Sequence, residues 1–237
     1  MRILLTNDDG YNQEGILLLR KELERYGEVI LVAPKVVQSA KSCAITIGET
    51  KVEKIDDTTY ALDGTPIDCV LFGICNFNID LVVSGCNNSP NLGVDTIYSG
   101  TCGACTQALI ANLPAIAFSC AGKDYFSQIT KFSKEALDYI FSNNLLSKDY
   151  FLNVNFPHGK YERTNGVKLT KLFYQRIKYE TMNFHLDTFI SHRTMDMSIE
   201  DPTFDVGAFN LGYTSITPLG TSNFHQCDYE KLIKELR

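Results

Sequence analysis

The chain opens with Met1-Arg2-Ile3-Leu4-Leu5-Thr6-Asn7-Asp8-Asp9-Gly10, which joins a short apolar run to two adjacent carboxylates. The apolar run at residues 3–5 predicts a buried strand. Ligands of open α/β sheets bind at the carboxyl ends of the strands, so Asp8 and Asp9 stand where a site is expected. Two neighbouring carboxylates repel each other unless a cation or a proton lies between them, and the pair therefore indicates a metal site. Asn, Asp and Gly are also common in solvated turns, which stays the alternative for this stretch alone.

Length and composition describe an ordinary globular protein. The 237 residues suit one large domain or one domain with an appendage, and the chain is 44% hydrophobic and 21% charged. Its formal net charge is -6 and it contains no long run of Lys and Arg, which argues against a nucleic-acid-binding protein. An acidic enzyme that acts on a phosphorylated substrate needs a metal to offset charge repulsion.

The location expected for the chain is the cytoplasm, without contact to a membrane. No apolar leader precedes the first strand, and no stretch approaches the roughly 18 apolar residues of a membrane-spanning helix. The eight cysteines are then expected to be free, mostly buried thiols. Cys102 and Cys105 form a C-x-x-C pair without a second ligand pair or a thioredoxin-like context, so we interpret them as small helix-packing residues.

Alternating strand and helix patterns run through the first 155 residues and predict an α/β fold. Such alternation is typical of a Rossmann-like, mostly parallel sheet with helices on both faces. We expect strands at 3–5, 29–33, 80–84, 115–119 and 151–155, and helices at 14–26 (with Gly27 as C-cap), 65–76, 99–112 and 128–141. Residues 43–47 and 51–55 alternate in polarity and predict a small hairpin or sheet edge.

The sequence changes in character after Pro157. Residues 160–210 are rich in charged and aromatic side chains without helical periodicity, which predicts an extended β-rich arm or hairpin used in oligomerisation. A strand at 213–218 and a closing helix at 229–236 are expected to pack back on the core. We therefore divide the chain into a catalytic core at 1–157 and a C-terminal arm with closing elements at 158–237.

Polar side chains collect at the expected carboxyl ends of several strands. Asp8 and Asp9 follow the first strand, Ser39 lies a few residues beyond the second, and Asn87 follows the strand at 80–84. Carboxylate, hydroxyl and amide oxygens form a hard ligand set that suits Mg²⁺, Mn²⁺ or Ca²⁺ rather than zinc. All four histidines lie outside the α/β part, so a histidine-based metal site is not expected.

A second signal is Ser99-Gly100-Thr101 at the start of a predicted helix. Free N–H groups at a helix N-terminus attract phosphate, and glycine lets a ligand approach the backbone closely. An ordinary N-cap serine followed by glycine is the alternative. Familiar nucleotide motifs such as the P-loop and G-x-G-x-x-G are absent from the sequence. Asp8 and Asp9 are adjacent, whereas a haloacid-dehalogenase-type phosphatase needs Asp-x-Asp.

A series of motifs extends over nearly the whole chain. In order these are residues 2–10, Val32-Ala33-Pro34 with Ser39-Ala40, Gly64-Thr65-Pro66 with Asp68-Cys69-Val70, Val83-Ser84-Gly85-Cys86-Asn87, Pro90-Asn91-Leu92-Gly93, Tyr98-Ser99-Gly100-Thr101, Asn153-Val154-Asn155-Phe156-Pro157 and Gly212-Tyr213-Thr214-Ser215-Ile216-Thr217-Pro218-Leu219. In this order they resemble the SurE (survival protein E) family of metal-dependent nucleotidases. Several spaced motifs in one order are far more specific than any one of them.

The resemblance implies a fold, an assembly and an activity. It implies a Rossmann-like core with a swapped C-terminal arm, a homodimer or homotetramer, and hydrolysis of nucleoside monophosphates to nucleoside and phosphate. The implied enzyme is a 5′-nucleotidase, with 3′-nucleotidase and exopolyphosphatase activities as extensions and one divalent cation per subunit. The implied metal ligands are Asp8, Asp9, Ser39 and Asn87, and the implied phosphate-binding residues are Asn91, Ser99, Gly100 and Thr101, to which we add Asn7.

The expected mechanism is attack of a metal-activated water on phosphorus, with Asp8 or Asp9 orienting or deprotonating that water. Ser89 and Gln107 depart from the family pattern, as do cysteines at 86, 102 and 105, but none of them replaces an implied ligand. Two rival functions stay open at this stage. One is a haloacid-dehalogenase-type phosphatase with a phosphoaspartate intermediate, and the other is a non-catalytic nucleotide-binding stress protein.

Overall fold

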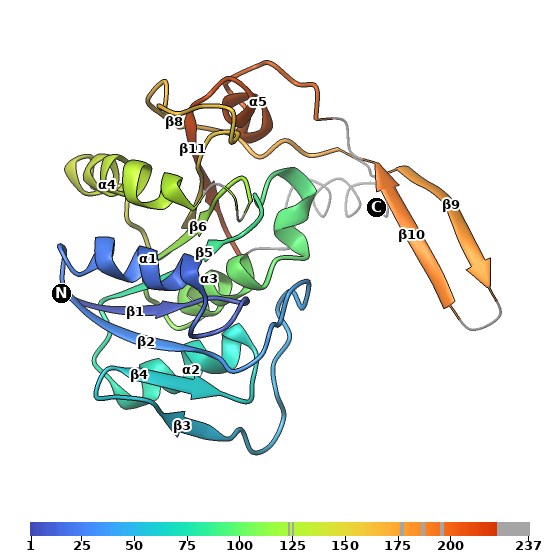
Figure 1. Cartoon of the computed structure of the whole chain (residues 1–237). Coiled ribbons are helices and arrows are strands. Elements are labelled where there is room, and N and C mark those ends of the chain that lie inside the picture. Colours follow the sequence, from blue (N-terminus) through green and yellow to red (C-terminus); the bar gives the residue numbers. More distant parts are fainter. Residues whose placement is uncertain (123, 125, 176–177, 186–187, 195–196, 222–237) are drawn as a thin grey trace, which may run out of the picture.

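The computed structural model of the chain describes residues 1–122, 124, 126–175, 178–185, 188–194 and 197–221. Among these residues, nine strands form one sheet in the order β3-β4-β2-β1-β5-β6-β7-β11-β8 (Figure 1). Its strands are β1 (Arg2–Thr6), β2 (Glu28–Pro34), β3 (Val52–Lys54), β4 (Thr59–Leu62), β5 (Leu81–Asn87), β6 (Ala115–Ser119), β7 (Phe151–Asn155), β8 (Val167–Leu169) and β11 (Thr214–Leu219). The helices are α1 (Glu14–Leu23), α2 (Pro66–Asn76), α3 (Gly100–Ile110), α4 (Ser127–Ser142), α5 (Asp205–Asn210) and the 3-10 helix η1 (Gly93–Ile97).

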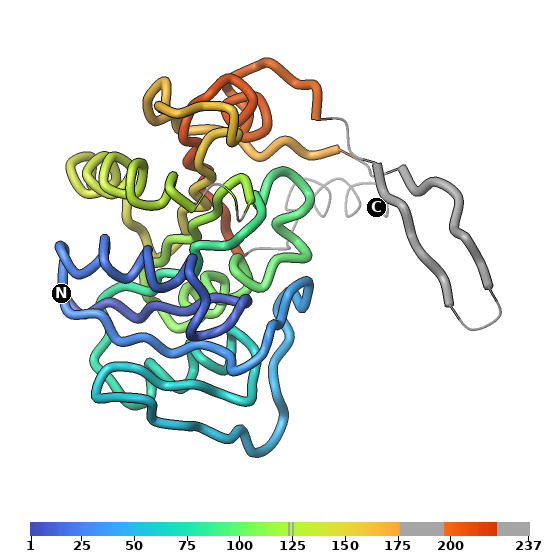
Figure 2. The backbone as a smooth tube through the Cα atoms, viewed as in Figure 1, coloured from blue at the N-terminus to red at the C-terminus, as the bar shows by residue number. Residues whose placement is uncertain are grey.

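Helices cover both faces of this sheet, as the sequence predicts (Figure 2). Successive residues of a strand point to opposite faces, and β1 illustrates the consequence. Ile3 and Leu5 pack in one core cluster with side chains of α1 and α4, whereas Leu4 packs in a second cluster with side chains of α2 and α3. All three are fully buried, which explains why the strand is a continuous apolar run rather than an alternating one.

The sheet is mostly parallel, and its strand order reverses at β1. β1 pairs in parallel with β2 on one side and with β5 on the other. The chain thus builds outward from β1 to β2, and later returns to start again at β5. In open α/β sheets such a switch point leaves a crevice at the carboxyl ends of the strands, where ligands bind. The loops after β1 and β5 carry Asp8, Asp9 and Asn88 to this crevice.

Helix α2 shows how local sequence defines an element. Thr65 accepts a hydrogen bond from the backbone N–H of Asp68, and the Asp68 carboxylate accepts one from the backbone N–H of Thr65. This reciprocal capping box satisfies two N–H groups that an isolated helix start would leave unpaired. Pro66 follows as the first helical residue, where its missing N–H costs nothing. The helix predicted at 65–76 is confirmed.

Helix α1 ends earlier than its sequence pattern predicts. The apolar periodicity extends to Tyr26, but the helix stops at Leu23, and Glu24 rather than Gly27 is its C-cap. Gly27 serves another purpose, because a Cβ built there would lie 2.1 Å from the backbone oxygen of Met1. The glycine is required where the turn into β2 crosses the start of β1, which lies beside it in the sheet.

The hairpin expected from residues 43–47 and 51–55 is wrong, but the alternative of a sheet edge is confirmed for the second stretch, where β3 is an edge strand. Residues 43–47 form an irregular loop, and β3 pairs antiparallel with β4, a strand that the sequence analysis did not predict. Contacts with distant segments hold this loop instead. Ser42 donates to the backbone oxygen of Ile97 and Thr46 donates to the Asp68 carboxylate, while Ile45 and Ile47 are exposed.

Beyond residue 157 the chain both completes the sheet and leaves it. β11 pairs antiparallel with β7, and β8 pairs in parallel with β11, so the strand expected at 213–218 is confirmed. β9 (Lys178–His185) and β10 (Thr188–Thr194) form a separate antiparallel pair that extends away from the sheet in Figure 1. The short helix α5 lies within the segment expected to be extended. The closing helix expected at 229–236 lies outside the described residues.

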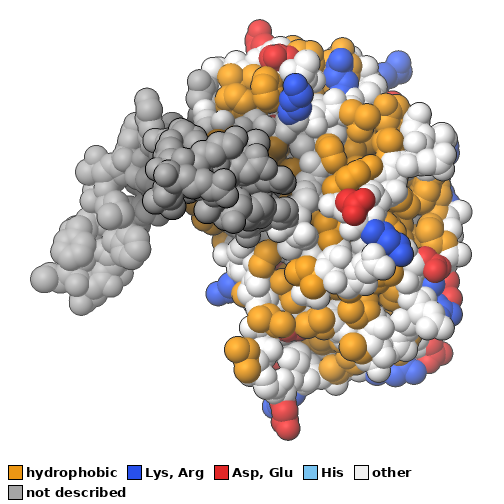
Figure 3. All heavy atoms as spheres, turned by 180° about the vertical axis from the view of Figure 1, so that it is seen from behind, with side chains coloured by type: hydrophobic (Ala, Val, Ile, Leu, Met, Phe, Trp, Pro, Cys, Tyr) orange, Lys and Arg blue, Asp and Glu red, His pale blue; other side chains and the backbone are white. Residues whose placement is uncertain are grey.

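The described cysteines agree with the compositional analysis. The seven cysteines of the described residues are free thiols, and all except Cys43 and Cys75 are buried. In Figure 3, Lys and Arg side chains on the rear face are dispersed among acidic, polar and apolar ones. No helix of the described residues is long and apolar enough to cross a membrane.

Candidate functional site

The loops at the switch point enclose two adjoining pockets. One has a volume of about 190 Å³ and is lined by residues of the loops after β1, β2 and β5 and by Ser99. The other has a volume of about 260 Å³. Asp8 lines the first pocket, Asp9 lines the second, and Ser39 and Asn88 line both. Residues from distant motifs therefore meet at the carboxyl edge of the sheet.

Asp8 is a nearly buried carboxylate, with 3% of its surface exposed. Burial raises the pKa of Asp8, while hydrogen bonds from the Thr101 hydroxyl and from the backbone of Gly100 act against that rise. The Thr101 hydroxyl donates to Oδ1 of Asp8 over 2.9 Å. A Cβ built on Gly100 would lie 3.0 Å from Oδ2 of Asp8, so the glycine lets the start of α3 touch this carboxylate. Asp8 is held from α3, ninety-three residues away from Thr101 in the chain.

Asp9 is held by a residue that the sequence analysis missed. The side-chain amide of Asn88 donates to Oδ1 of Asp9 over 2.9 Å. Asn88 directly follows the predicted ligand Asn87, and its place in a polar loop after a buried strand is the signal that could have found it. Asp9 itself is 8% exposed.

Asn87 ends β5 with its side-chain amide already oriented. Its Nδ2 donates to the backbone oxygen of Ser89 over 2.7 Å, so Oδ1 is the atom that can serve as a ligand. The β5–β6 register shifts between Ser84 and Asn87, and Gly85 has φ +127° where a Cβ would lie 2.3 Å from the backbone oxygen of Phe118. Ser89 contributes its backbone carbonyl, so its departure from the family's usual glycine leaves this contact intact.

Ser39 is an exposed residue in the loop after β2. The loop is tied to the end of β1, since the backbone N–H of Gln38 donates to the backbone oxygen of Asp8 over 2.7 Å. Ala40 follows with φ +58°, a left-handed conformation that turns the loop across the pocket, which Ala40 also lines. The hydroxyl of Ser39 is thus carried to the border of the two pockets.

Two of the predicted phosphate-binding residues have other contacts. Asn7 is fully buried, and its side chain donates to the backbone oxygen of Gly10 and accepts from the Gly10 N–H. The Thr101 side chain is fully buried as well and donates to Asp8. Neither residue is among those that line the two pockets. Asn7 shapes the turn after β1, and Thr101 orients Asp8.

Asn91 and Ser99 do line the first pocket. The side chain of Asn91 donates to Ser119, its N–H donates to Asn155, and its backbone oxygen accepts from Asn153 and Asn155. Ser119 and Asn155 end β6 and β7, Asn153 lies within β7, and all three are fully buried. The sequence analysis did not connect them with the site, although buried polar residues at strand ends were a usable signal. The network fixes the loop at Asn91.

Ser99 is the N-cap of α3. Its hydroxyl accepts a hydrogen bond from the backbone N–H of Cys102 over 3.1 Å. The helix has eleven residues and begins at Gly100, so its positive end faces the pocket that Ser99 lines. The predicted N-cap is confirmed. The N-terminus of α3 borders the first pocket, and the free N–H groups of a helix N-terminus attract phosphate.

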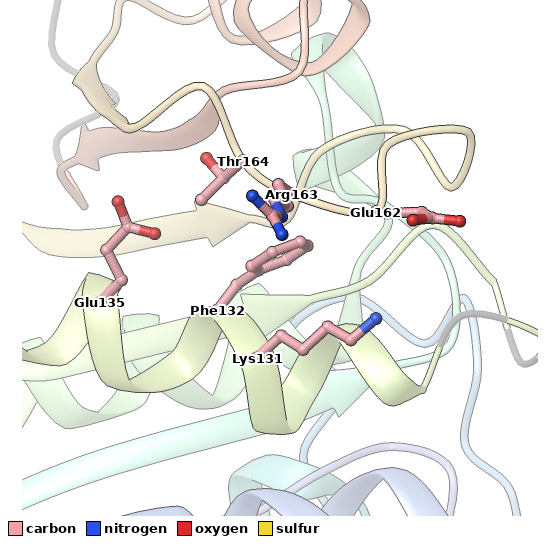
Figure 4. Close-up of a pocket in the computed structure, with 6 residues that line it drawn as sticks. All are labelled: Lys131, Phe132, Glu135, Glu162, Arg163 and Thr164. Carbon is pink, nitrogen blue, oxygen red and sulfur yellow. The ribbon is translucent and has the colours of Figure 1, made fainter.

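A larger hollow of about 480 Å³ lies elsewhere, between α4 and residues 162–164. Figure 4 shows the side chains around it, with Phe132 beneath Arg163 and with Glu135 and Glu162 on opposite sides. Its two cationic and two acidic side chains offset each other, and none of its lining residues belongs to the motifs at the switch point. The chemistry suited to a phosphorylated ligand is at the smaller pockets.

The chain is similar to the proteins of one known family over most of its length. The family model described as "Survival protein SurE" matches residues 3–179. The chain belongs to the SurE family. A curated relative from Alkaliphilus metalliredigens, named 5'-nucleotidase SurE, is 38% identical over 256 residues, covering 98% of this chain and 97% of the relative. A relative of the same name from Idiomarina loihiensis is 37% identical and covers 92% of this chain and 91% of its own length.

The SurE fold is also found in a solved structure. The crystal structure of the SurE protein from Aquifex aeolicus superimposes with a TM-score of 0.86 at 33% sequence identity, covering 100% of this chain and 99% of that one. The likeness extends over both the switch-point core and the segments after residue 157. The Rossmann-like fold expected from the sequence is therefore confirmed.

Proposed function

We propose that this SurE chain is a metal-dependent phosphomonoesterase that hydrolyses nucleoside 5′-monophosphates to nucleoside and phosphate. The curated relatives are named 5'-nucleotidase SurE and cover most of the chain. The observation that carries the proposal is the meeting of oxygen ligands and a helix N-terminus around one pocket. The pocket's lining includes Asp8, Asn87, Asn91 and Ser99 from four separate motifs.

The donor set fits a hard divalent cation such as Mg²⁺ or Mn²⁺, with Ca²⁺ as the alternative. Among the described residues no cluster of three or more His, Cys, Asp and Glu could hold a metal, and the proposed site therefore adds Ser39 and Asn87 to the two aspartates. Asp8 takes part in no ion pair with Lys or Arg among the described residues. A buried carboxylate without a cationic partner is unfavourable, and a bound cation would relieve this. We propose Asp8, Asp9, Ser39 and Asn87 as its ligands.

A divalent cation supplies polarisation of the phosphate and a lower pKa for the attacking water. The chain's own residues supply position and charge. Thr101 and Gly100 hold the Asp8 carboxylate, and Asn88 holds Asp9. The Asp8–Asp9 pair provides a carboxylate that accepts a proton from the water. The start of α3 at Ser99 stabilises negative charge on the phosphoryl oxygens.

The test is phosphate release from a panel of nucleoside 5′- and 3′-monophosphates and polyphosphate, after EDTA treatment and with Mg²⁺, Mn²⁺ or Ca²⁺ restored. We expect cation-dependent release, and we expect Asp8→Asn to abolish it while the fold persists. Asp57→Asn is a matched control, since that carboxylate is exposed and pairs with Lys54. If Asp8→Asn kept near-normal activity with the cation restored, the proposed cation site would be wrong. Tight nucleotide binding without release would support a binding protein instead.

We propose further that β9 and β10 join copies of the chain into a homodimer or homotetramer in the cytoplasm. Among the described residues this pair is a separate two-stranded sheet that extends away from the core (Figure 1). A two-stranded hairpin by itself is only marginally stable in water, so a partner surface would explain its presence. Sedimentation of the full chain as a monomer would contradict this assembly.

A further inference from the structure

The second pocket at the switch point shares the proposed cation ligands Asp9 and Ser39 with the site, but its other walls have no role in binding the cation or the phosphate. It has a volume of about 260 Å³ and is separated from the first pocket by residues that line both, Ser39 and Asn88. Asp9, one of the proposed cation ligands, lines it directly. A group bound there would therefore lie next to the reacting phosphate but outside the pocket that contains the start of α3.

The wall of this second pocket differs in chemistry from that of the first. Phe126, at the start of α4, and Val37, in the loop after β2, contribute apolar surface. The ring of Phe126 is half-buried and packs over α1, since a Cβ built on Gly15 would lie 3.4 Å from its Cζ. Val37 is 61% exposed. Glu14, the first residue of α1, adds a carboxylate beside these apolar groups.

This combination suits a nucleoside better than it suits a phosphate or a cation. Neither of those needs an aromatic or aliphatic wall, whereas a base has a flat face that stacks on an aromatic ring. The ribose hydroxyls of a nucleoside are donors that a carboxylate can accept. When the phosphate of a phosphomonoester occupies the first pocket, its leaving group has to lie outside that pocket. The second pocket adjoins the first and is lined by Asp9.

We propose that the second pocket binds the nucleoside of the substrate and that Phe126 is the residue on which the base stacks. The inference rests on the proposed nucleotidase function and adds to it the part of the site that distinguishes a nucleotide from another phosphate ester. Phe126 acts on substrate choice and takes no part in bond cleavage. Val37 lines the same pocket.

Tyr98 is the competing aromatic residue. It lines the first pocket, next to Asp95, and is 41% exposed. A base over Tyr98 would have to share the roughly 190 Å³ pocket with the phosphate and its ligands. The second pocket leaves that volume to the phosphate alone, and this favours Phe126.

The experiment compares adenosine 5′-monophosphate with ribose 5-phosphate, which keeps the sugar and phosphate but lacks the base. The measured quantity is kcat/KM for adenosine 5′-monophosphate divided by kcat/KM for ribose 5-phosphate. Because Phe126→Ala removes the ring on which the base stacks, this ratio should fall by about 5- to 100-fold. The change should come mainly from KM for the nucleotide. Phe126→Tyr keeps a ring face and should restore the ratio, and Leu17→Ala, an exposed change on α1, is the control outside the site.

Each outcome decides the proposal. If kcat/KM of Phe126→Ala falls equally for both substrates or for neither, the ratio is unchanged and the proposal is overturned. Thermal unfolding would identify a variant that fails to fold. If Phe126→Ala fails to fold, the more conservative Phe126→Leu, which removes the ring but keeps apolar volume, takes its place. A ratio that falls in Tyr98→Ala but not in the Phe126 variants would move the base to the first pocket. Wild-type protein that releases phosphate from neither substrate would contradict the nucleotidase function itself.

Discussion

Thr101→Val should shift the pH dependence of cation binding without removing any proposed ligand. The Thr101 hydroxyl donates to Asp8 over 2.9 Å in a site where Asp8 is 3% exposed. Burial raises the pKa of Asp8, and this hydrogen bond is the largest of the effects that act against that rise. A hydrogen bond to a charged group contributes about 1.5–3 kcal/mol, which corresponds to about 1–2 pH units. The variant should therefore hold its Asp8 proton to a higher pH.

A proton on Asp8 competes with a cation for the same carboxylate. At acidic pH the variant should bind Mn²⁺ roughly 10- to 100-fold more weakly than wild type, and at alkaline pH the two should converge. The assay is calorimetric titration of the protein with Mn²⁺ across pH, followed by the pH profile of kcat/KM. Thr106→Val is the matched control, because that hydroxyl bonds the backbone oxygen of Cys102 in the same helix. A stable Thr101→Val protein with the wild-type profile would refute the role of Thr101.

Two further predictions concern Gly100 and Asp68. Gly100→Ala should lower kcat/KM by about 10-fold or more while leaving the unfolding temperature unchanged or higher, because the added Cβ would lie 3.0 Å from Asp8 whereas alanine favours helix. Burial raises the pKa of Asp68, but hydrogen bonds from Thr46 and Thr65 outweigh this and lower it below 3.8. The resulting stabilisation is present above the pKa of the unfolded chain and is lost as pH falls through the folded-state pKa. Near neutral pH the free energy of unfolding of Asp68→Asn should therefore be about 1 kcal/mol lower than that of the wild type. On acidification this free energy should fall less in the variant than in the wild type, as measured by urea unfolding.

The sequence predicts the fold well where one local rule dominates. Strands buried on both faces are continuous apolar runs, which is why β1, β2, β5, β6 and β7 could be located. The start of α2 was equally clear, because Thr65 and Asp68 cap it by themselves. The errors arose where distant contacts decide. Residues 43–47 are anchored by Ser42 and Thr46 to other segments rather than to a partner strand.

The site follows the same division. The types and order of Asp8, Asp9 and Asn87 indicated an oxygen-ligand site, and the structure brings them to one edge of the sheet. The sequence does not distinguish the residues that line a pocket from the residues that orient these lining side chains. Thr101 belongs to the second kind, since its only described hydroxyl contact is Asp8. Asn88 belongs to it in part, since it holds Asp9 and also lines both pockets.

Three of the four proposed ligands are oriented before any cation arrives, by hydrogen bonds to α3 or to the loop after β5. Asp8 is held from α3, Asp9 from the loop after β5, and Asn87 by the backbone of Ser89. The conformational entropy of these side chains is thus lost when the chain folds rather than when the cation binds. The consequence is that a substitution at Thr101 or Asn88 should weaken cation binding by about 10- to 100-fold although it removes no ligand. No short segment of the chain would hold the cation by itself, because the geometry depends on strand order at the switch point.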